Sequence, residues 1–453
     1  MARISRRGFL ERSTGAAAAG AVTLAAAQPR PRAASSPNEK IIVGVMGFGG
    51  RGGWLARAFS GRPDVEIAAI ADPVSSRFDA RVQTIAKAQN REPKIVADFR
   101  RLLDDPNIDA IVNATPDHWH CPGTVFACQA GKDVYVEKPA SYNIWEGRKA
   151  VEAARKYERV VQLGTQTRSA AYAQHAVEYL RSGKLGDIHL IRVYNMKTRG
   201  QIPPRPDGQT PQGVDYNLWC GPAELKPYNP NYVSQWNWFW NFSGGDIIND
   251  GVHHIDLARW LGGLTSPKSA VSTGGIFHFK DAGETPDTQL VEYEFDRLAF
   301  QVFNTLWTPY MPKIAQEIRQ GDLLPHWPSC ATRIEVYGTK GMMYVGRHGG
   351  GWQVFGDEWV NDKEVAHEYG REPSEAHIAN FCECVRSRKR PNADIEEGHI
   401  STILCHLGNI SSRLGNRQLR WDGKTETFVG DEEANRLLKR PVQRAPFGIP
   451  EKV

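Results

Sequence analysis

From Lys40 to about Gly164, short apolar runs alternate with segments that have helical periodicity. The apolar runs have the length of strands and lie at Ile41–Met46, Val65–Ala71, Ala110–Ala114, Val134–Val136 and Val160–Leu163. The helical patterns between them cover Trp54–Phe59, Arg77–Ala88, Thr124–Ala130 and Ile144–Tyr157. Strands that are apolar throughout, with helices between them, are typical of a parallel sheet covered on both faces. The pattern therefore predicts a doubly wound α/β domain over residues 40–164.

After Gly164 the pattern changes to one helix, Ala170–Leu180, followed by strands rich in β-branched and aromatic residues. These predicted strands are Ile188–Met196, Ala270–Phe277, Thr288–Phe295, Phe300–Asn304, Ile334–Tyr337, Met342–Val345 and Trp352–Phe355. Because no regular helices separate them, we expect a large, open and mainly antiparallel sheet. Two helices, Glu375–Arg388 and Glu397–Leu414, complete an α+β domain over residues 165–415, and residues 416–453 form an extension.

The N-terminus differs in character from the rest of the chain. Residues 5–11 read Ser-Arg-Arg-Gly-Phe-Leu-Glu, and an alanine-rich, weakly apolar stretch follows to Ala27. This arrangement indicates a twin-arginine export signal over residues 1–27, although an ordinary basic N-terminus is the alternative. Residues 28–39 are rich in Pro and Ser and predict a flexible spacer. We therefore expect a periplasmic or otherwise exported protein.

Composition narrows the possible partners of this 453-residue chain. Its net charge is +5, and four arginines of the predicted signal supply much of it. No basic stripe is present, so nucleic acid is not an expected partner. No run after the signal is long and apolar enough for a stable membrane span. The seven cysteines make no zinc or CxxC pattern, which favours free, mostly buried thiols.

A glycine-rich loop follows the first predicted strand and opens a helix. It reads Gly47-Phe48-Gly49-Gly50-Arg51-Gly52, and the acidic residue Asp72 ends the second strand. Glycines at these three positions allow a tight turn, close approach to a pyrophosphate and close packing of helix on strand. Asp72 is placed to bind ribose hydroxyls, which favours NAD, while the nearby Arg77 leaves NADP open.

Four further segments carry a resemblance to a known family. They are Thr115-Pro116-Asp117-His118-Trp119-His120, Glu137-Lys138-Pro139, Gly164-Thr165-Gln166, and the glycine-rich run from Ser243 to Asp256. Together with the glycine loop, residues 40–415 resemble the Gfo/Idh/MocA oxidoreductases. The resemblance implies a Rossmann domain, a second domain whose open sheet often mediates dimers, and sugar or polyol chemistry through tightly held NAD(P). It also implies a homo-oligomer, either a dimer or a tetramer.

The same resemblance implies which residues handle the proton. They are Lys138 of the Glu-Lys-Pro motif and His253 of the glycine-rich motif. The family commonly has Asp four residues before that histidine, whereas this chain has Asn249 there and Asp250 next to it. Either Asp250 serves as the third catalytic residue, or the amide of Asn249 suffices to hold the substrate.

Chemistry supports these assignments. Removing a hydride from a sugar carbon requires that the hydroxyl proton leaves as well, so a base must lie within hydrogen-bond reach. The ordinary pKa of His253 is near neutrality, and a partly desolvated Lys138 has a lowered pKa. The alternative interpretations are a buried structural histidine and a surface lysine.

The remaining site predictions form two groups. Predicted cofactor contacts are Gly47, Phe48, Gly49, Gly50, Arg51, Gly52, Asp72, Thr115, His120, Glu137, Lys138 and Gln166. Predicted substrate contacts are Arg168, Trp238, Asn249, His253 and His254. Solvation of Arg168, core packing of Trp238 and a structural role for His254 are the alternatives. No metal site is predicted, because His118 and His120 lack a third nearby ligand in the sequence.

Three functions fit this sequence. The first is a redox-neutral enzyme that acts on a sugar or glycoside with captive NAD, by transfer, epimerisation or oxidation followed by elimination of a glycosidic oxygen. Export favours it, because no free nicotinamide pool exists outside the inner membrane. The second is an ordinary sugar or polyol dehydrogenase that exchanges its cofactor. The third is a non-catalytic sugar-binding protein, which only Asn249 favours.

Overall fold

The computed structural model describes residues 40–356, 363–441 and 443–453. The predicted export signal, residues 1–27, and the predicted spacer, residues 28–39, lie outside the described residues. Within the described ranges, none of the helices combines the length and the apolar character that a bilayer crossing requires. All seven cysteines are buried and free.

The first sheet is parallel and has the order β3-β2-β1-β4-β5-β6. Its strands are β1 (Ile41–Met46), β2 (Val65–Ala71), β3 (Lys94–Val96), β4 (Ala110–Asn113), β5 (Asp133–Val136) and β6 (Val161–Leu163). Its helices are α2 (Gly50–Ser60), α3 (Ala80–Gln89), α4 (Arg100–Leu103), α5 (His120–Gln129) and α6 (Ile144–Lys156). The predicted doubly wound fold is confirmed, with β3 as the one strand that the apolar pattern did not predict.

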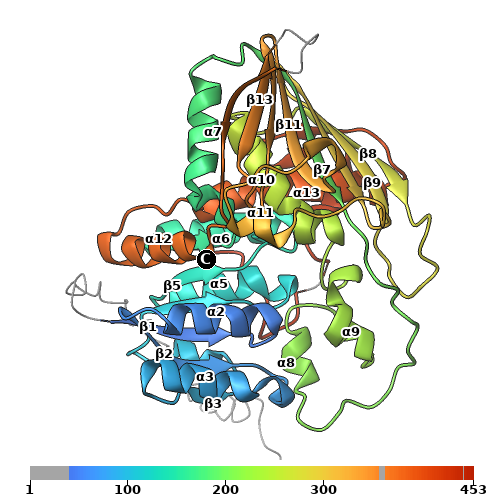
Figure 1. Ribbon diagram of the computed structural model, residues 1–453. Coiled ribbons are helices and arrows are strands. Elements are labelled where there is room, and N and C mark those ends of the chain that lie inside the picture. Colours follow the sequence, from blue (N-terminus) through green and yellow to red (C-terminus); the bar gives the residue numbers. More distant parts are fainter. Residues whose placement is uncertain (1–39, 357–362, 442) are drawn as a thin grey trace, which may run out of the picture. The chain divides into compact units, whose positions relative to one another are not determined.

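Two apolar clusters explain why these strands are apolar throughout. One cluster joins the sheet to α5 and α6 through residues such as Val125 and Val151. The other joins it to α2 and α3 through Leu55, Phe59 and Ile85, and it includes Phe381 of the distant helix α12 (Ser374–Ser387). Because helices cover both faces, residues of both parities are buried along β1, β4, β5 and β6, whereas β3 at the edge of the sheet has no buried residue (Figure 1).

The second sheet has the order β14-β13-β12-β11-β7-β10-β9-β8-β15-β16. Its strands are β7 (Ile188–Met196), β8 (Ser269–Gly275), β9 (Thr288–Glu294), β10 (Ala299–Thr305), β11 (Thr332–Gly338), β12 (Gly341–Val345), β13 (Trp352–Gly356), β14 (Glu364–Glu368), β15 (Leu419–Asp422) and β16 (Thr427–Phe428). β7 and β10 pair in parallel, with Ile191 opposite Phe300, and the other pairs are antiparallel. The predicted, mainly antiparallel sheet is confirmed.

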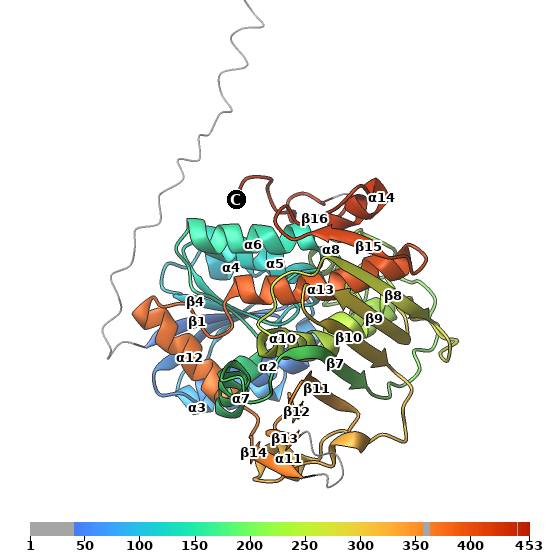
Figure 2. The same ribbon diagram turned by 90° about the horizontal axis from the view of Figure 1, so that it is seen from above.

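One face of this sheet is covered by α7 (Ala171–Arg181), α10 (Val252–Leu261) and α13 (Ile395–Arg413), as Figure 2 shows. The strands alternate accordingly: along β9 every second residue is buried and the residues between are exposed or half-buried. Burial of one face requires that apolar and polar residues alternate along the strand, and this alternation made the strands predictable from the sequence.

Residues 200–245 connect β7 to the turn before α10 and have little regular structure. They contain two short helices, α8 (Tyr216–Cys220) and α9 (Pro230–Gln235), around an aromatic cluster with Trp219, Phe239 and Phe242. A π-helical turn, Ile247–Gly251, then leads into α10. The remaining short elements are α11 (Gln316–Gln320), α14 (Glu432–Asn435) and the 3-10 turns Ser75–Arg77, Asp117–Trp119, Gln166–Ser169, Trp236–Trp238, Trp327–Ser329 and Arg436–Leu438.

Candidate active site

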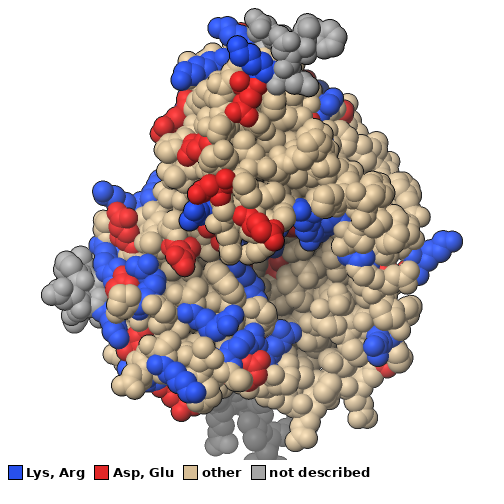
Figure 3. Space-filling model, viewed as in Figure 1, with Lys and Arg blue, Asp and Glu red and all other residues tan. Residues whose placement is uncertain are grey.

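A cavity of about 590 Å³ opens at the carboxyl ends of the parallel strands. The segments after β1, β2, β4 and β5 form one wall, and the π-helical turn, α10 and the loop after β12 form the other. The front face of the molecule is hollowed here, with Lys and Arg side chains around the recess (Figure 3). This edge is where ligands bind in doubly wound folds.

The glycine loop at the cavity wall requires its glycines. Gly47 has φ of +85°, and a Cβ there would lie 2.8 Å from the carbonyl oxygen of Ala114. A Cβ on Gly52 would lie 1.9 Å from the carbonyl oxygen of Gly47, so this glycine lets α2 pack against the loop. Gly49 and Gly50 line the cavity where α2 begins, and its first N–H groups are free to bind an anion. The loop therefore fits a pyrophosphate.

Asp72 fixes the loop and faces the cavity. Its carboxylate accepts hydrogen bonds from the backbone N–H groups of Phe48, at 2.7 Å, and Val74, at 2.9 Å. Burial raises the pKa of Asp72 even though these N–H groups and Arg77 favour the ionised form. Arg77 also lines the cavity, and its guanidinium lies against the position that a Gly49 side chain would occupy. The Phe48 side chain is buried, and only the backbone of this residue takes part in the loop's contact with Asp72.

Arg51 and Glu137 join the glycine loop to the end of β5. Arg51 Nε donates to Glu137 Oε1 at 2.7 Å, and both residues line the cavity. Burial would raise the pKa of Glu137, but the charges of Arg51 and Lys138 outweigh it and hold that pKa below its usual value. The carboxylate therefore stays ionised beside the lysine.

Three other predicted cofactor residues line the same cavity: Thr115, His120 and Gln166. The ring of His120 lies between the carbonyl oxygens of Pro139, at 2.7 Å from Nδ1, and Thr115, at 2.8 Å from Nε2. Burial lowers the pKa of His120 to about 4, so the ring is neutral near pH 7 and donates to one carbonyl at a time. His120 thus ties the loop after β4 to the segment after β5.

Lys138 connects the two walls. Its Nζ donates to the side-chain oxygen of Asn249 at 3.0 Å and to the backbone oxygen of the same residue. Burial lowers the pKa of Lys138, and the negative charges of Glu137 and Asp117 oppose that shift. The amide oxygen of Asn249 is therefore the acceptor at the position where the resemblance implied a carboxylate.

His253 faces the cavity from the first turn of α10 and is 7% exposed. Burial, followed by the positive charges of Arg347 and Lys138, holds the pKa of His253 well below its usual value. Among the residues that the structure describes, none hydrogen-bonds its ring, so a neutral imidazole nitrogen is available to a ligand.

Asp250 does not contact the His253 ring through a hydrogen bond. Its carboxylate instead pairs with Lys197, at 3.0 Å, and with Arg347. Burial would raise the pKa of Asp250, but these two cations hold it well below its usual value. An ionised carboxylate with two cationic partners is a poor proton acceptor and a good anchor.

Family models match most of the chain. The oxidoreductase family with an NAD-binding Rossmann fold matches residues 41–165, and the C-terminal domains of the same family match residues 223–344 and 342–449. The chain belongs to the GFO/IDH/MocA oxidoreductase family. It is therefore an oxidoreductase with an NAD-binding domain, as predicted.

Relatives of this family resemble the chain at low identity. It is 25% identical over 360 residues to scyllo-inositol 2-dehydrogenase (NAD(+)) of Bacillus subtilis, covering 78% of this chain and 88% of that one. It is 27% identical over 222 residues to a glycosyl hydrolase family 109 protein of Shewanella baltica, covering 45% of this chain and 48% of that one. The aldose-aldose oxidoreductase of Caulobacter crescentus has the same fold, with a TM-score of 0.61, 17% identity, and coverage of 84% of this chain and 100% of that one.

Motif comparison with the family missed one wall of the site. Arg319, Arg347 and His348 all line the cavity. Arg347 and His348 follow β12, and the backbone oxygen of Arg347 accepts a hydrogen bond from Thr167 at 2.9 Å. The available signal was the run Gly349-Gly350-Gly351 after them, in which all three residues have positive φ.

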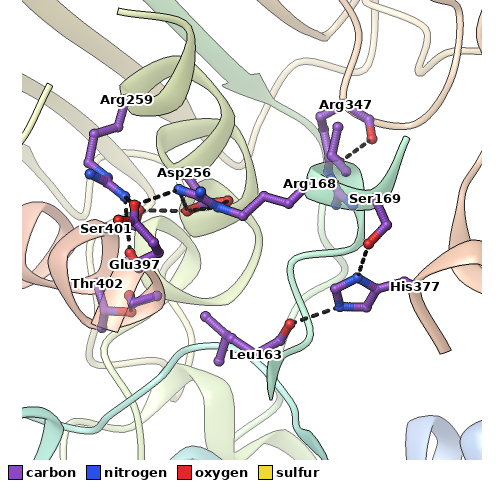
Figure 4. Close-up of polar contacts among 12 residues, drawn as sticks. Leu163, Arg168, Ser169, Asp256, Arg259, Arg347, His377, Glu397, Ser401 and Thr402 are labelled. Carbon is purple, nitrogen blue, oxygen red and sulfur yellow. Dashed lines mark hydrogen bonds and ion pairs between the residues drawn. The ribbon is translucent and has the colours of Figure 1, made fainter. Parts of the chain in front are cut away.

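Arg168 does not reach the cavity, so the substrate-binding role expected for it does not match its position. The residue is 5% exposed, and its guanidinium makes a bidentate ion pair with Asp256 of α10, 2.8 Å at the shortest (Figure 4). Ser401 donates to the same carboxylate, and Glu397 bridges Arg168 to Arg259. A buried cation needs such partners, and here they lie in the interior of the second domain.

His254 and Trp238 also lie off the cavity wall that the structure describes. His254 is fully buried, and burial lowers its pKa to about 3, which fits the structural alternative. The ring of Trp238 lies against the guanidinium of Arg199, at 5.1 Å. Trp236 and Asn237, immediately before it, line the cavity instead. The 3-10 turn therefore presents its first two residues, rather than Trp238, to the cavity.

Proposed function

We propose that this protein acts on a sugar or glycoside by hydride transfer, with Lys138 and His253 handling the hydroxyl proton. One observation carries the proposal: the Lys138–Asn249 pair and the neutral His253 ring line the same cavity as the glycine loop. A substrate carbon in this cavity has a proton acceptor and a cationic donor beside it, and the nicotinamide, when bound, supplies the hydride acceptor.

The proton has a defined route in this arrangement. The unprotonated nitrogen of His253 accepts the proton of the substrate hydroxyl, because its lowered pKa keeps the ring neutral at physiological pH. Two of the donors of Lys138 are directed at Asn249, which leaves one N–H for the developing alkoxide. Asp250 holds Arg347 and Lys197 in place through its two ion pairs and does not itself take up the proton.

We further propose that the cofactor stays bound and is restored within each turnover. A carbonyl formed on the sugar makes the adjacent C–H acidic, which permits elimination of a glycosidic oxygen, and reduction then returns the cofactor to its starting state. Similarity to a glycosyl hydrolase family 109 protein and to an aldose-aldose oxidoreductase supports such a cycle. The twin-arginine pattern of residues 5–11 also supports it, because an exported enzyme meets no nicotinamide pool.

The test is an assay of the protein recovered from the periplasm on a panel of glycosides, without added NAD. We expect glycoside cleavage over many turnovers that added NAD does not accelerate, with a keto-sugar formed only as an intermediate. Turnover that stops after one equivalent and resumes with added NAD contradicts recycling, while leaving the hydride-transfer proposal intact.

An ordinary sugar or polyol dehydrogenase is the second candidate. Similarity to scyllo-inositol 2-dehydrogenase (NAD(+)) over 78% of this chain favours it. In that case the protein exchanges its cofactor, and activity follows the concentration of added NAD.

We also propose that the chain forms a dimer or tetramer, which light scattering of the purified protein tests.

A further inference from the structure

A second cavity, of about 740 Å³, lies apart from the active site. Among the described residues, none lines both cavities, although the segment 224–244 contributes different residues to each. Its walls come from the start of α6, the segment 224–244, the C-terminal half of α13 and the chain between Arg436 and Arg444. None of the roles assigned above uses it.

This second cavity is cationic. Six Lys and Arg residues line it against two carboxylates, Glu224 and Glu284; the six are Lys226, Arg413, Arg436, Lys439, Arg440 and Arg444. Arg444 donates its hydrogen bonds to neutral acceptors only. These are the backbone oxygens of Gly221 and Asn217 and the side-chain oxygen of Asn217. Its charge therefore has no anionic partner among these contacts. Lys439 and Arg440 are paired with Glu451 and Glu146, which do not line the cavity, so four cations face two carboxylates. A concave surface with this imbalance attracts anions.

Arg440 is a buried cation in the wall of this cavity. It is 7% exposed, its Nε pairs with the buried Glu146 at 2.8 Å, and its guanidinium lies 3.5 Å from the centre of the Tyr142 ring. Its Nη2 has no hydrogen-bond partner among the described residues. Buried donors are nearly always satisfied, because an unpaired one loses its hydration without compensation. The second carboxylate oxygen of the same ion pair, Glu146 Oε2, is also buried without a hydrogen-bond partner, so the Arg440–Glu146 pair keeps unused hydrogen-bonding capacity in the cavity wall.

The same cavity has aromatic surface. Trp240 is half-buried in its wall, and the guanidinium of Arg413 lies 5.2 Å from the Trp240 ring centre. The backbone N–H of Trp240 donates to Glu284 at 2.8 Å, and its Nε1 donates to the backbone oxygen of Glu284 at 3.0 Å. These two bonds hold the indole in place. An aromatic ring next to arginines binds a flat apolar face that carries an anionic group at its edge.

We propose that this cavity is a binding site for an acidic sugar, separate from the catalytic centre. The carboxylate pairs with Arg413, and the pyranose ring packs on Trp240. A fixed guanidinium fork suits a carboxylate better than a lysine does. The site holds an acidic residue of a glycan while the active site acts on another residue.

Isothermal titration of the full-length protein with 4-nitrophenyl β-D-glucuronide tests this assignment, with 4-nitrophenyl β-D-glucoside as the neutral probe. We expect the glucuronide to bind at least tenfold more tightly than the glucoside, since a hydrogen bond between charged groups is strong. We expect Arg413→Gln to weaken glucuronide binding about tenfold or more. Arg420→Gln removes the same charge from exposed β15, outside the cavity, and serves as the matched control.

Two further variants separate this site from the active site. Lys138→Met removes the catalytic lysine, and we expect it to leave the glucuronide affinity within twofold. Trp240→Leu removes the aromatic surface, and we expect it to weaken both probes. Equal losses in Arg413→Gln and Arg420→Gln would show that general charge attraction alone is at work and would overturn the proposal. Loss of glucuronide binding in Lys138→Met would place the probe in the catalytic cavity and would also overturn it.

Discussion

The Nζ of Lys138 and the side-chain oxygen of Asn249 lie 3.0 Å apart across the active-site cavity. Lys138 follows β5 of the Rossmann sheet, and Asn249 lies in the π-helical turn before α10. Their hydrogen bond therefore joins two residues that are 111 positions apart in the sequence. Lys138 is half-buried and lines the cavity together with Asn249. In the mechanism proposed above, this pair lies where the substrate hydroxyl gives up its proton.

Replacing Lys138 by Met tests its role in the reaction. We expect turnover to fall by two orders of magnitude or more, because the stabilisation of the developing alkoxide is lost. The nucleotide should stay bound, since the glycine loop and Asp72 are unchanged. Steady-state kcat and the nucleotide content of the purified variant measure the two effects. A kcat within threefold of the unmodified enzyme would contradict the assignment.

The pH dependence of turnover reports on His253. Its pKa is held well below the usual value, so the ring is unprotonated and can accept a proton at neutral pH. It becomes protonated, and stops acting as a base, only when the pH falls through that lowered pKa. The acidic limb of the kcat/KM profile should therefore lie below pH 6.5, the usual pKa of histidine. We expect His253→Ala to remove this limb along with nearly all activity. A limb at or above neutrality would assign the base elsewhere.

Asn249→Asp places a carboxylate beside Lys138. A negative charge 3.0 Å from the amine favours its protonated form, so the pKa of Lys138 should rise. We expect the alkaline limb of the pH–rate profile to move upward, and Asn249→Ser, which keeps a neutral acceptor, should not move it. An unchanged alkaline limb in Asn249→Asp would show that Lys138 does not titrate in the reaction.

Two neighbouring glycines provide a matched test of the cofactor loop. A Cβ on Gly52 would lie 1.9 Å from the carbonyl oxygen of Gly47, whereas a Cβ on Gly50 meets nothing within 4 Å. We expect Gly52→Ala to cost ~2 kcal/mol or more of stability and to lose the nucleotide, since backbone must move. Gly50→Ala should fold with unchanged stability. Thermal unfolding compares the two, and equal melting temperatures would contradict the packing argument.

Arg168 should matter for stability and not for substrate recognition. Arg168→Met leaves the buried carboxylate of Asp256 without its bidentate partner, which typically costs ~3–5 kcal/mol. We expect a large drop in the urea midpoint and an unchanged KM in the fraction that remains folded. A raised KM with an unchanged midpoint would restore the substrate-binding hypothesis.

The sequence predicted the strands in which one pattern of apolar residues, either continuous or alternating, extends over the whole strand. β1, β2 and β7 are apolar or alternating over their whole length, and their predicted bounds match the structure. The three-residue β3 and the polar β14 were missed, because neither is apolar enough to stand out. Their pairing comes from neighbouring strands, which a local pattern does not contain.

The site was predictable where a motif fixes the backbone and not where the fold brings distant segments together. Gly47 and Gly52 are required by local geometry, and Lys138 and His253 stand in motifs. Arg347 reaches the cavity only because β12 ends there, and no motif marked it. The buried ion pair of Arg168 was not predictable, because its partner Asp256 is 88 residues away and an exposed arginine and a buried one look alike in sequence.

The most direct test of the whole account is the nucleotide content of the mature protein. Full-length protein is expressed in a host with a twin-arginine pathway, the form that our proposal expects in the periplasm is purified, and the nucleotide released by heat denaturation is quantified. The account predicts about one NAD(H) per chain, retained through extensive dialysis. Processed protein that contains no nucleotide and takes up none from added NAD would contradict it.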